Sequence, residues 1–193
     1  MVMEIYSKLL GGNAMSDSQT DLYEKPINSQ RLFEGKIINV RRDEVTLPNG
    51  RTATREVVEH PGAVAIVPIT KEGNIILVRQ FRHPIGRVIL EVPAGKLDPG
   101  ENPEACARRE LAEETGFMPQ KLQKLTAIYT TPGFSNEIIH LYMAEDLIDS
   151  DKLPDEDEFI HTETYSPEQI RQMIASGELC DAKSLVALCL AGI

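Results

Sequence analysis

The sequence predicts an α/β fold, an α/β/α sandwich with a mixed β-sheet and an additional N-terminal β-sheet. Three observations favour it. Short apolar runs typical of buried strands fill the first half of the chain, a capped helix follows at 103–115, and further strand patterns precede two helices near the C-terminus. At 193 residues the chain has the length of one domain with an appended segment.

The chain is divided into three parts by its composition. Residues 1–30 are expected to be a flexible leader, because Gly11-Gly12-Asn13-Ala14 precedes a second candidate start at Met15. Residues 31–60 form an N-terminal β segment, with Pro48-Asn49-Gly50 as a hairpin signal. Residues 61–193 form the main domain.

Six strands are expected in the main domain. The first is the continuous apolar run 64–69, which is typical of a buried strand. The others follow at 75–81, 88–92, 122–131, 138–144 and 159–165. Because these strands alternate with helices along the chain, a mixed sheet between helical layers is the architecture that buries their apolar side chains.

Two helices are expected after the last strand. Ser166 and Gln169 form a capping-box signature, and Gly177 ends that helix. A final helix covers 181–190 and is expected to turn four side chains inward, namely Leu185, Val186, Leu188 and Cys189.

The composition argues against a nucleic-acid partner and against a membrane span. The net charge of −10 argues against a nucleic-acid scaffold, because phosphate backbones are bound by clustered Lys and Arg. A small anionic substrate stays compatible with this charge, since bound cations and a few arginines can reverse the field at one site. No apolar window is long enough for a membrane span. Cys106, Cys180 and Cys189 form no CxxC pair, which indicates packed, reduced thiols in a cytoplasmic protein.

The helix at 103–115 has unusually clear ends. Asn102 is a good N-cap, Pro103 suits the first helical position, and Gly116 supplies the left-handed residue that ends a helix. A tight loop, 95–101, carries the chain from the preceding strand into this helix and adds the carboxylate of Glu101.

Three glutamates share one face of this helix. Glu110, Glu113 and Glu114 lie three or four residues apart, with Arg109 one turn before Glu113. A solvated acidic face is the alternative, but such a face usually carries interspersed lysines, and here only Arg109 offsets the acids. Clustered carboxylates are what Mg²⁺ or Mn²⁺ needs when water and substrate phosphate complete its shell.

The spacing of these residues resembles a known family. Gly95, Glu101, Arg109-Glu110, Leu111, Glu113-Glu114, Gly116 and Phe117 fit the Nudix box position for position. The flanking stretches 55–62, 78–82 and 90–98 are similar to the ADP-ribose pyrophosphatase branch of the Nudix hydrolases, as is Pro132, fifteen positions after Phe117. The resemblance covers residues 31–191.

The resemblance implies hydrolysis of ADP-ribose to AMP and ribose 5-phosphate with Mg²⁺, or Mn²⁺ as an alternative. Glu110 and Glu114 would be the principal metal ligands, helped by the Ala94 carbonyl. Glu113 would be a further ligand or would orient the attacking water, and Glu101 would support the loop or an outer metal. Arg109 would hold Glu113 in place.

A late acidic loop, 155–158, is the implied source of the general base. Glu156 is the expected base and Glu158 the expected metal ligand, with a merely solvated loop as the alternative.

Substrate contacts are expected from arginines and from one loop. Arg55 and Arg82 are the main candidates and Arg79 a further one, because bidentate donors suit pyrophosphate and ribose oxygens. Solvation or pairing with acids is the alternative for Arg79 and Arg82. Gly133 and Phe134 would shape the ribose end.

The resemblance also implies a homodimer whose protomers exchange their N-terminal sheets, so that 31–60 completes the partner's site. Packing of this sheet on its own core is the alternative. Two other functions stay open: a Nudix hydrolase for a dinucleotide, a nucleotide sugar or a modified nucleoside triphosphate, and a non-catalytic ADP-ribose sensor. Sensors usually pair a degenerate box with a DNA-binding domain, whereas this chain keeps every box glutamate and has no room for a winged helix.

Overall fold

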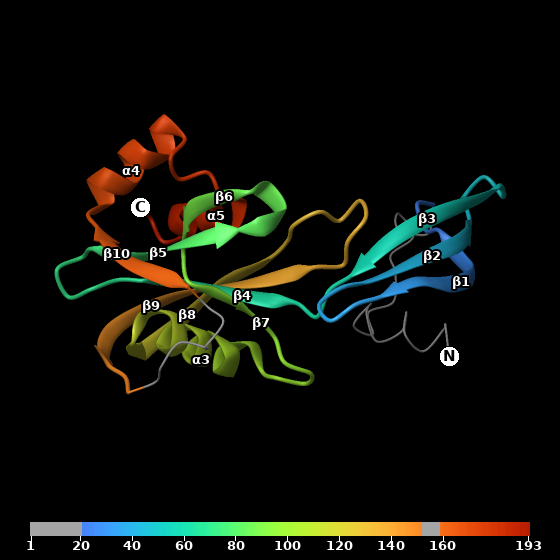
Figure 1. Ribbon diagram of the computed structural model, residues 1–193. Helices are drawn as coiled ribbons and strands as arrows, with labels where there is room; N and C mark the ends of the chain where they lie inside the picture. The colour runs from blue at the N-terminus through green and yellow to red at the C-terminus, as the bar shows by residue number, and fades with distance from the viewer. Residues whose placement is uncertain (1–20, 152–158) are drawn as a thin grey trace. The chain divides into compact units, whose positions relative to one another are not determined.

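The computed structural model describes residues 21–151 and 159–193, which fall into two compact units (Figure 1). The N-terminal unit contains the described residues up to His60 together with the loop Thr131–Asn136. The core unit contains Pro61–Thr130 and, among the described residues, the chain from Glu137 to Ile193.

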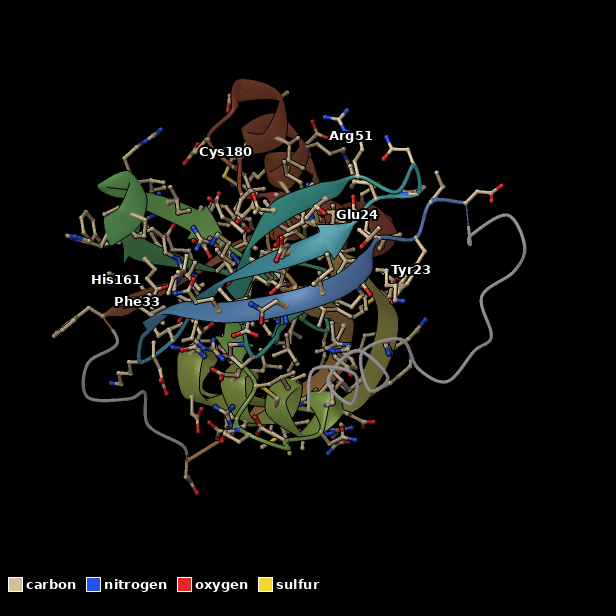
Figure 2. The ribbon with its side chains drawn as sticks, turned by 90° about the vertical axis from the view of Figure 1, so that its right-hand side faces the viewer. Tyr23, Glu24, Phe33, Arg51, His161 and Cys180 are labelled. Atoms are coloured by element: carbon tan, nitrogen blue, oxygen red, sulfur yellow. The ribbon has the colours of Figure 1, made fainter. Side chains whose placement is uncertain are left out.

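The N-terminal unit is built on a three-stranded antiparallel sheet in the order β1-β2-β3. Its strands are β1 (Lys25–Glu34), β2 (Asn39–Thr46) and β3 (Thr52–Glu59). Gly50 takes the left-handed conformation in the turn between β2 and β3, with φ of 81°. In Figure 2, Glu24 lies near Arg51 at one end of this sheet, whereas Phe33 lies at the other end.

A loop from later in the chain joins this sheet. The Val58 N–H donates to the Phe134 carbonyl at 2.7 Å, and the Asn136 N–H donates to the Val58 carbonyl at 3.2 Å. The His60 N–H donates to the Asn136 side-chain oxygen at 2.8 Å. These bonds fix residues 131–136 beside β3.

The predicted leader, residues 1–30, extends too far along the chain. Residues 25–30 belong to β1, so the N-terminal sheet begins before the expected boundary at residue 31. The sequence Lys25–Glu34 is largely polar and almost entirely exposed, so it lacks the alternation that marks a half-buried strand. Backbone pairing with β2, from Lys25 with Thr46 to Glu34 with Asn39, makes it a strand.

The core unit contains a mixed sheet, as predicted. Its order is β7-β4-β9-β8, with β4 parallel to β9 and the other pairs antiparallel. The strands are β4 (Ala63–Pro68), β7 (Ala94–Lys96), β8 (Phe117–Tyr129) and β9 (Ile138–Asp149). A second, antiparallel sheet, β10-β5-β6, contains β5 (Ile75–Arg82), β6 (Arg87–Glu91) and β10 (Ile160–Tyr165). A short 3₁₀ turn, η1 (His83–Ile85), links β5 and β6.

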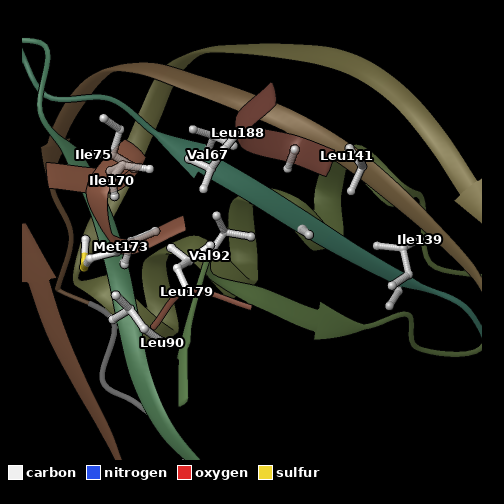
Figure 3. Close-up of a cluster of buried hydrophobic side chains, with 14 residues drawn as sticks. Val67, Ile75, Leu90, Val92, Ile139, Leu141, Ile170, Met173, Leu179 and Leu188 are labelled. Atoms are coloured by element: carbon white, nitrogen blue, oxygen red, sulfur yellow. The ribbon is translucent and has the colours of Figure 1, made fainter. Parts of the chain in front are cut away.

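The helices lie on opposite sides of β4 (Figure 1). The helix α3 (Pro103–Thr115) covers one face, while α4 (Pro167–Ser176) and α5 (Ala182–Leu190) lie on the other. Alternation along β4 serves both layers. Val64 and Ile66 pack with Leu111 of α3, and Ala65 and Val67 pack into the cluster of Figure 3, which also takes in Val92, Ile170 and Leu188. This is the predicted α/β/α sandwich.

Some predicted inward positions are wrong. In α5, Leu188 is buried and Leu185 is half-buried, but Val186 and Cys189 are exposed. The helix packs through Ser184, Ala187 and Leu188, whose spacing of three and four defines a different stripe.

The three cysteines differ in their burial. Cys106 is buried as predicted, and burial is the main reason that the pKa of its thiol rises to about 12. Cys180 and Cys189 are exposed, so packing is the wrong reading for them. Among the helices of the described segments, none has the length and apolar character needed to cross a membrane.

Candidate functional site

The acidic helix α3 has the predicted ends. Asn102 is its N-cap, and the side-chain oxygen accepts from the Glu104 N–H at 2.8 Å. Gly116 is left-handed with φ of 74°, and its N–H donates to the Ala112 carbonyl at 3.0 Å. These local bonds fix where the helix begins and ends. On the helix between them, Glu110 and Glu114 are buried, at 8% and 6% exposure.

The short strand β7 lies directly against these two carboxylates. The Ala94 N–H donates to Glu114 Oε2 at 3.0 Å. A Cβ on Gly95 would stand 1.7 Å from the Glu110 Cδ, so only glycine leaves room for that carboxylate. The Glu110 carboxylate therefore occupies the space that a side chain at position 95 would need.

Arg109 connects the remaining acids. Its guanidinium donates to Glu113 at 3.0 Å, as predicted, and also to Glu110 at 2.8 Å. Two further bonds, of 3.0 and 2.9 Å, reach Glu101. The hydrogen bond from Arg109 is the main reason that the pKa of Glu101 falls to about 2.

Glu101 also closes the loop that leads into α3. Its carboxylate accepts from the Asp98 N–H at 3.0 Å, a contact that sits within the tight loop 95–101. Glu101, Glu110 and Glu113 are thus held by one arginine, and the charges that would otherwise repel are ordered around it.

The donors suit a hard divalent cation, although they are not arranged as a finished metal site. In the part of the chain that the structure describes, no three Asp, Glu, His or Cys side chains converge as a metal-binding group. Glu110 and Glu114 are nevertheless two buried carboxylates beside the start of β7. Mg²⁺ is commonly held by one or two carboxylates, with waters and substrate phosphates completing its shell. These residues fit that chemistry.

Two predicted residues cannot be placed. Glu156 and Glu158, the expected base and ligand, lie outside the described residues.

Arg82 lies in a buried charge cluster. Its Nε and Nη2 donate to the two oxygens of Glu91 at 2.8 and 2.7 Å, and Glu91 is only 1% exposed. Lys183 of α5 also donates to Glu91 and reaches Asp181 at 3.0 Å. Burial acts to raise the Glu91 pKa, but the Arg82 hydrogen bonds and the Lys183 charge outweigh it, so the pKa lies below its ordinary value.

Arg79 has a different partner. Its Nε and Nη2 donate to Glu163 of β10 at 2.6 and 3.1 Å, and Nη2 also donates to the Tyr165 hydroxyl at 3.3 Å. The bond to Glu163 is the main reason that the pKa of Arg79 is raised. Both core arginines are therefore paired with acids, which is the alternative considered for them.

The other three predicted substrate residues meet in the N-terminal unit. Arg55, Gly133 and Phe134 line one pocket of about 370 Å³, together with Pro132. The Arg55 Nε donates to Glu24 at 2.9 Å on the same pocket wall. The loop 131–136 brings Gly133 and Phe134 to this pocket because it is bonded to β3.

Three site residues were missed by sequence reasoning. Glu24 fell within the expected leader, and its partner Arg55 lies 31 residues away. Lys183 and Glu91 are 92 residues apart, so no local pattern joins them. Of these three residues, only Glu91 could have been found from the sequence, because an acid between Leu90 and Val92 in an apolar strand implies a buried partner.

Comparisons with known families agree with this arrangement. Residues 59–186 match the NUDIX domain, and residues 24–58 match the nucleoside diphosphate sugar hydrolase N-terminal domain. The second match begins one residue before β1, whose start the sequence pattern had not revealed.

Characterised relatives cover most of the chain. An ADP-ribose pyrophosphatase of Bacillus subtilis (strain 168) is 47% identical over 169 residues, which is 86% of this chain and 91% of that protein. A methanol dehydrogenase activator of Bacillus methanolicus is 42% identical over 167 residues, 86% of this chain and 90% of that protein. An ADP-ribose pyrophosphatase of Mycobacterium tuberculosis is 49% identical over 122 residues, 63% of this chain and 59% of that protein.

A solved structure shares the fold. A crystal structure titled as an ADP compounds hydrolase matches with a TM-score of 0.79 and 24% identity, over 93% of this chain and 95% of that one. With the box residues on α3 and on the segments that flank it, and with the NUDIX domain spanning 59–186, this chain belongs to the Nudix family of hydrolases.

Proposed function

We propose that this protein hydrolyses the pyrophosphate bond of ADP-ribose, or of a related ADP-sugar, to AMP and ribose 5-phosphate. The observation that carries the proposal is the buried pair Glu110 and Glu114 against Ala94 and Gly95 at the start of β7. The relative of Bacillus subtilis that is named an ADP-ribose pyrophosphatase supports the choice of substrate.

The reaction is proposed to need Mg²⁺, with Mn²⁺ as an alternative. Glu110, Glu114 and the Ala94 carbonyl would hold the ion. When bound, a divalent cation offsets the charge of the two linked phosphates and polarises an attacking water. Water adds to one phosphorus, the bond from that phosphorus to the bridging oxygen breaks, and the water's proton passes to a carboxylate base.

The surrounding residues organise the acids. Arg109 contacts Glu101, Glu110 and Glu113, so it fixes the side chains that flank the proposed ion. Glu113 stands at the edge of this group and is proposed as a further ligand or as the residue that orients the water. Glu156 as base and Glu158 as ligand remain predictions from the sequence.

Substrate recognition is assigned to arginines and to one pocket. A volume of about 370 Å³ falls within the range of small-molecule sites, roughly 300–1,000 Å³. Arg55, Gly133 and Phe134 on its wall are proposed to receive the ribose end. Arg82 is proposed to contact the pyrophosphate, because a guanidinium can donate two parallel bonds to phosphate oxygens.

A homodimer is proposed as the active assembly. The N-terminal sheet and its β1–β2 turn expose large apolar side chains that a single copy leaves in water, including Ile27, Leu32 and Phe33 of β1 and Ile37 of the turn, each about half exposed. A three-stranded sheet with so little buried surface gains stability by packing against another chain. Light scattering during gel filtration measures this directly. A cytoplasmic location is proposed from the three free thiols.

One experiment tests the function. Turnover is measured on ADP-ribose, other ADP-sugars, dinucleotides and nucleoside triphosphates, with Mg²⁺ and with chelator, and the products are separated by chromatography. The proposal expects AMP and ribose 5-phosphate from ADP-ribose, and loss of turnover with chelator. Faster turnover of a dinucleotide or a triphosphate would show that the enzyme prefers that substrate to ADP-ribose. Binding of ADP-ribose without cleavage would make the protein a sensor.

A further inference from the structure

The buried carboxylate of Glu91 has two cations, which come from different elements. Arg82, at the end of β5, donates two hydrogen bonds to it, at 2.8 and 2.7 Å. Lys183, in α5, forms an ion pair with the same carboxylate from the helix side. Because Glu91 is 1% exposed, water does not replace either cation.

The two cations differ in how firmly they are held. The Lys183 side chain is 13% exposed and is fixed on its other side by Asp181, at 3.0 Å. Asp181 is the N-cap of α5 and accepts from the Ser184 N–H at 3.0 Å and from the Ser184 hydroxyl at 2.6 Å. The Ser184 hydroxyl in turn accepts from the Val92 N–H at 2.9 Å. Lys183 is therefore anchored, through Asp181 and Ser184, to the segment between β6 and β7.

Arg82 is the cation that can leave. Its side chain is 39% exposed, three times the fraction of Lys183, and its bonds within the cluster all go to Glu91. Glu91 ends β6 three residues before Ala94, whose N–H donates to Glu114 at 3.0 Å, so Arg82 is bonded to the stretch of chain that leads into the proposed metal site. A pyrophosphate held there would compete with Glu91 for the same donors.

Removing one partner from a buried ion pair strongly destabilises the protein, because the remaining charge is left without compensation. With Arg82 as its only cation, Glu91 would hold the guanidinium and oppose substrate binding. We propose that Lys183 is a positioning residue, which stays on Glu91 as its counter-ion and so frees Arg82 to bind the pyrophosphate of the substrate. This rests on the proposed function, since it takes a diphosphate as the ligand of Arg82.

The test compares four variants with the wild type: Lys183→Met, Lys183→Arg, the double variant Lys183→Met with Glu91→Gln, and the control Lys121→Met. Lys121 is a matched control because it also pairs with a glutamate of the core unit, Glu145, but is 61% exposed. For each protein, KM and kcat on ADP-ribose are measured with Mg²⁺, together with the Kd of a methylene-bridged ADP-ribose analogue and the thermal unfolding midpoint.

Lys183→Met is expected to raise KM and the analogue Kd at least tenfold, about 1.4 kcal/mol, with kcat within threefold of wild type. Lys183→Arg keeps the charge and is expected to restore most of the affinity. In the double variant the acid no longer holds Arg82, so KM and Kd are expected to return to within about threefold of wild type. Lys121→Met is expected to bind as wild type does.

The double variant separates this role from a merely structural one. If Lys183 only supports the fold, losing a second member of the cluster will not restore affinity, and a double variant as weak as Lys183→Met overturns the proposal. An unchanged KM in Lys183→Met overturns it as well. If Lys183→Met does not fold, Lys183→Gln takes its place in both comparisons. A wild-type protein that neither binds nor cleaves ADP-ribose refutes the proposed function instead.

Discussion

The close approach of Gly95 to Glu110 gives a sharp prediction for Gly95→Ala. Gly95 is not in the left-handed region, so alanine can adopt its backbone conformation. The difficulty is one of space. The new Cβ would stand 1.7 Å from the Glu110 Cδ, 2.0 Å from Oε1 and 2.1 Å from Oε2. Ordinary contact begins at 3.4 Å, so the carboxylate has to move by about 1.7 Å, which is 3.4 minus 1.7.

That displacement sets the expected size of the effect. Misplacement of a reacting group by about 1 Å costs on the order of 100-fold in rate. We therefore expect kcat/KM on ADP-ribose to fall at least about 100-fold, equivalent to about 2.7 kcal/mol of transition-state stabilisation. Glu110 is also 8% exposed and bonded to Arg109, so its movement should lower the free energy of unfolding by about 1–3 kcal/mol, as overpacking usually does.

A second glycine separates the loss of activity from the loss of stability. Gly73 has φ of 81° and no atom within 4 Å of an added Cβ, so Gly73→Ala is strained but does not collide with any side chain. It should lose about 1–2 kcal/mol of stability and keep the wild-type kcat/KM. Both variants are compared by urea unfolding and by steady-state kinetics over a range of Mg²⁺ concentrations. A Gly95→Ala enzyme within threefold of wild type would refute the assignment of Glu110.

Three further predictions concern other parts of the molecule. Glu114→Gln keeps the volume of the side chain and removes its charge, so it should abolish Mg²⁺-dependent turnover while circular dichroism stays unchanged; near-normal kcat would count against a ligand role. Arg55→Ala should raise the KM for ADP-ribose about tenfold with little change in kcat, and an unchanged KM would remove it from the site. The hydrogen bond from Arg79 lowers the pKa of Glu163, so this carboxylate stabilises the fold above pH 4.5 and loses that contribution as the pH falls through its folded value. The Glu163→Gln variant should therefore have a free energy of unfolding in urea about 1 kcal/mol lower than that of the wild type at pH 7, with a smaller difference at pH 3. A larger difference at pH 3 would refute this role of Glu163.

The helix α3 and the N-terminal sheet show which elements a local sequence pattern can predict and which it cannot. The ends of α3 were predictable because Asn102 and Gly116 act on backbone groups within four residues of themselves. Most core strands were predictable for the same reason, since burial of β4 on both faces requires a continuous apolar run. The strand β1 was not, because its polar residues form a strand only through pairing with β2.

In the candidate site, too, local spacing predicts some contacts and not others. Local patterns in the sequence were enough to predict the α/β/α class, the three glutamates on α3 and the contact of Arg109 with Glu113, because each depends on spacing within a few turns of chain. Three other features became visible only in the packed fold: Arg82 shares Glu91 with Lys183, Arg55 pairs with Glu24, and Gly133 and Phe134 line the same pocket as Arg55. Such contacts join residues tens of positions apart, and a side chain's charge specifies the kind of partner it needs without specifying which one the packed fold brings within reach.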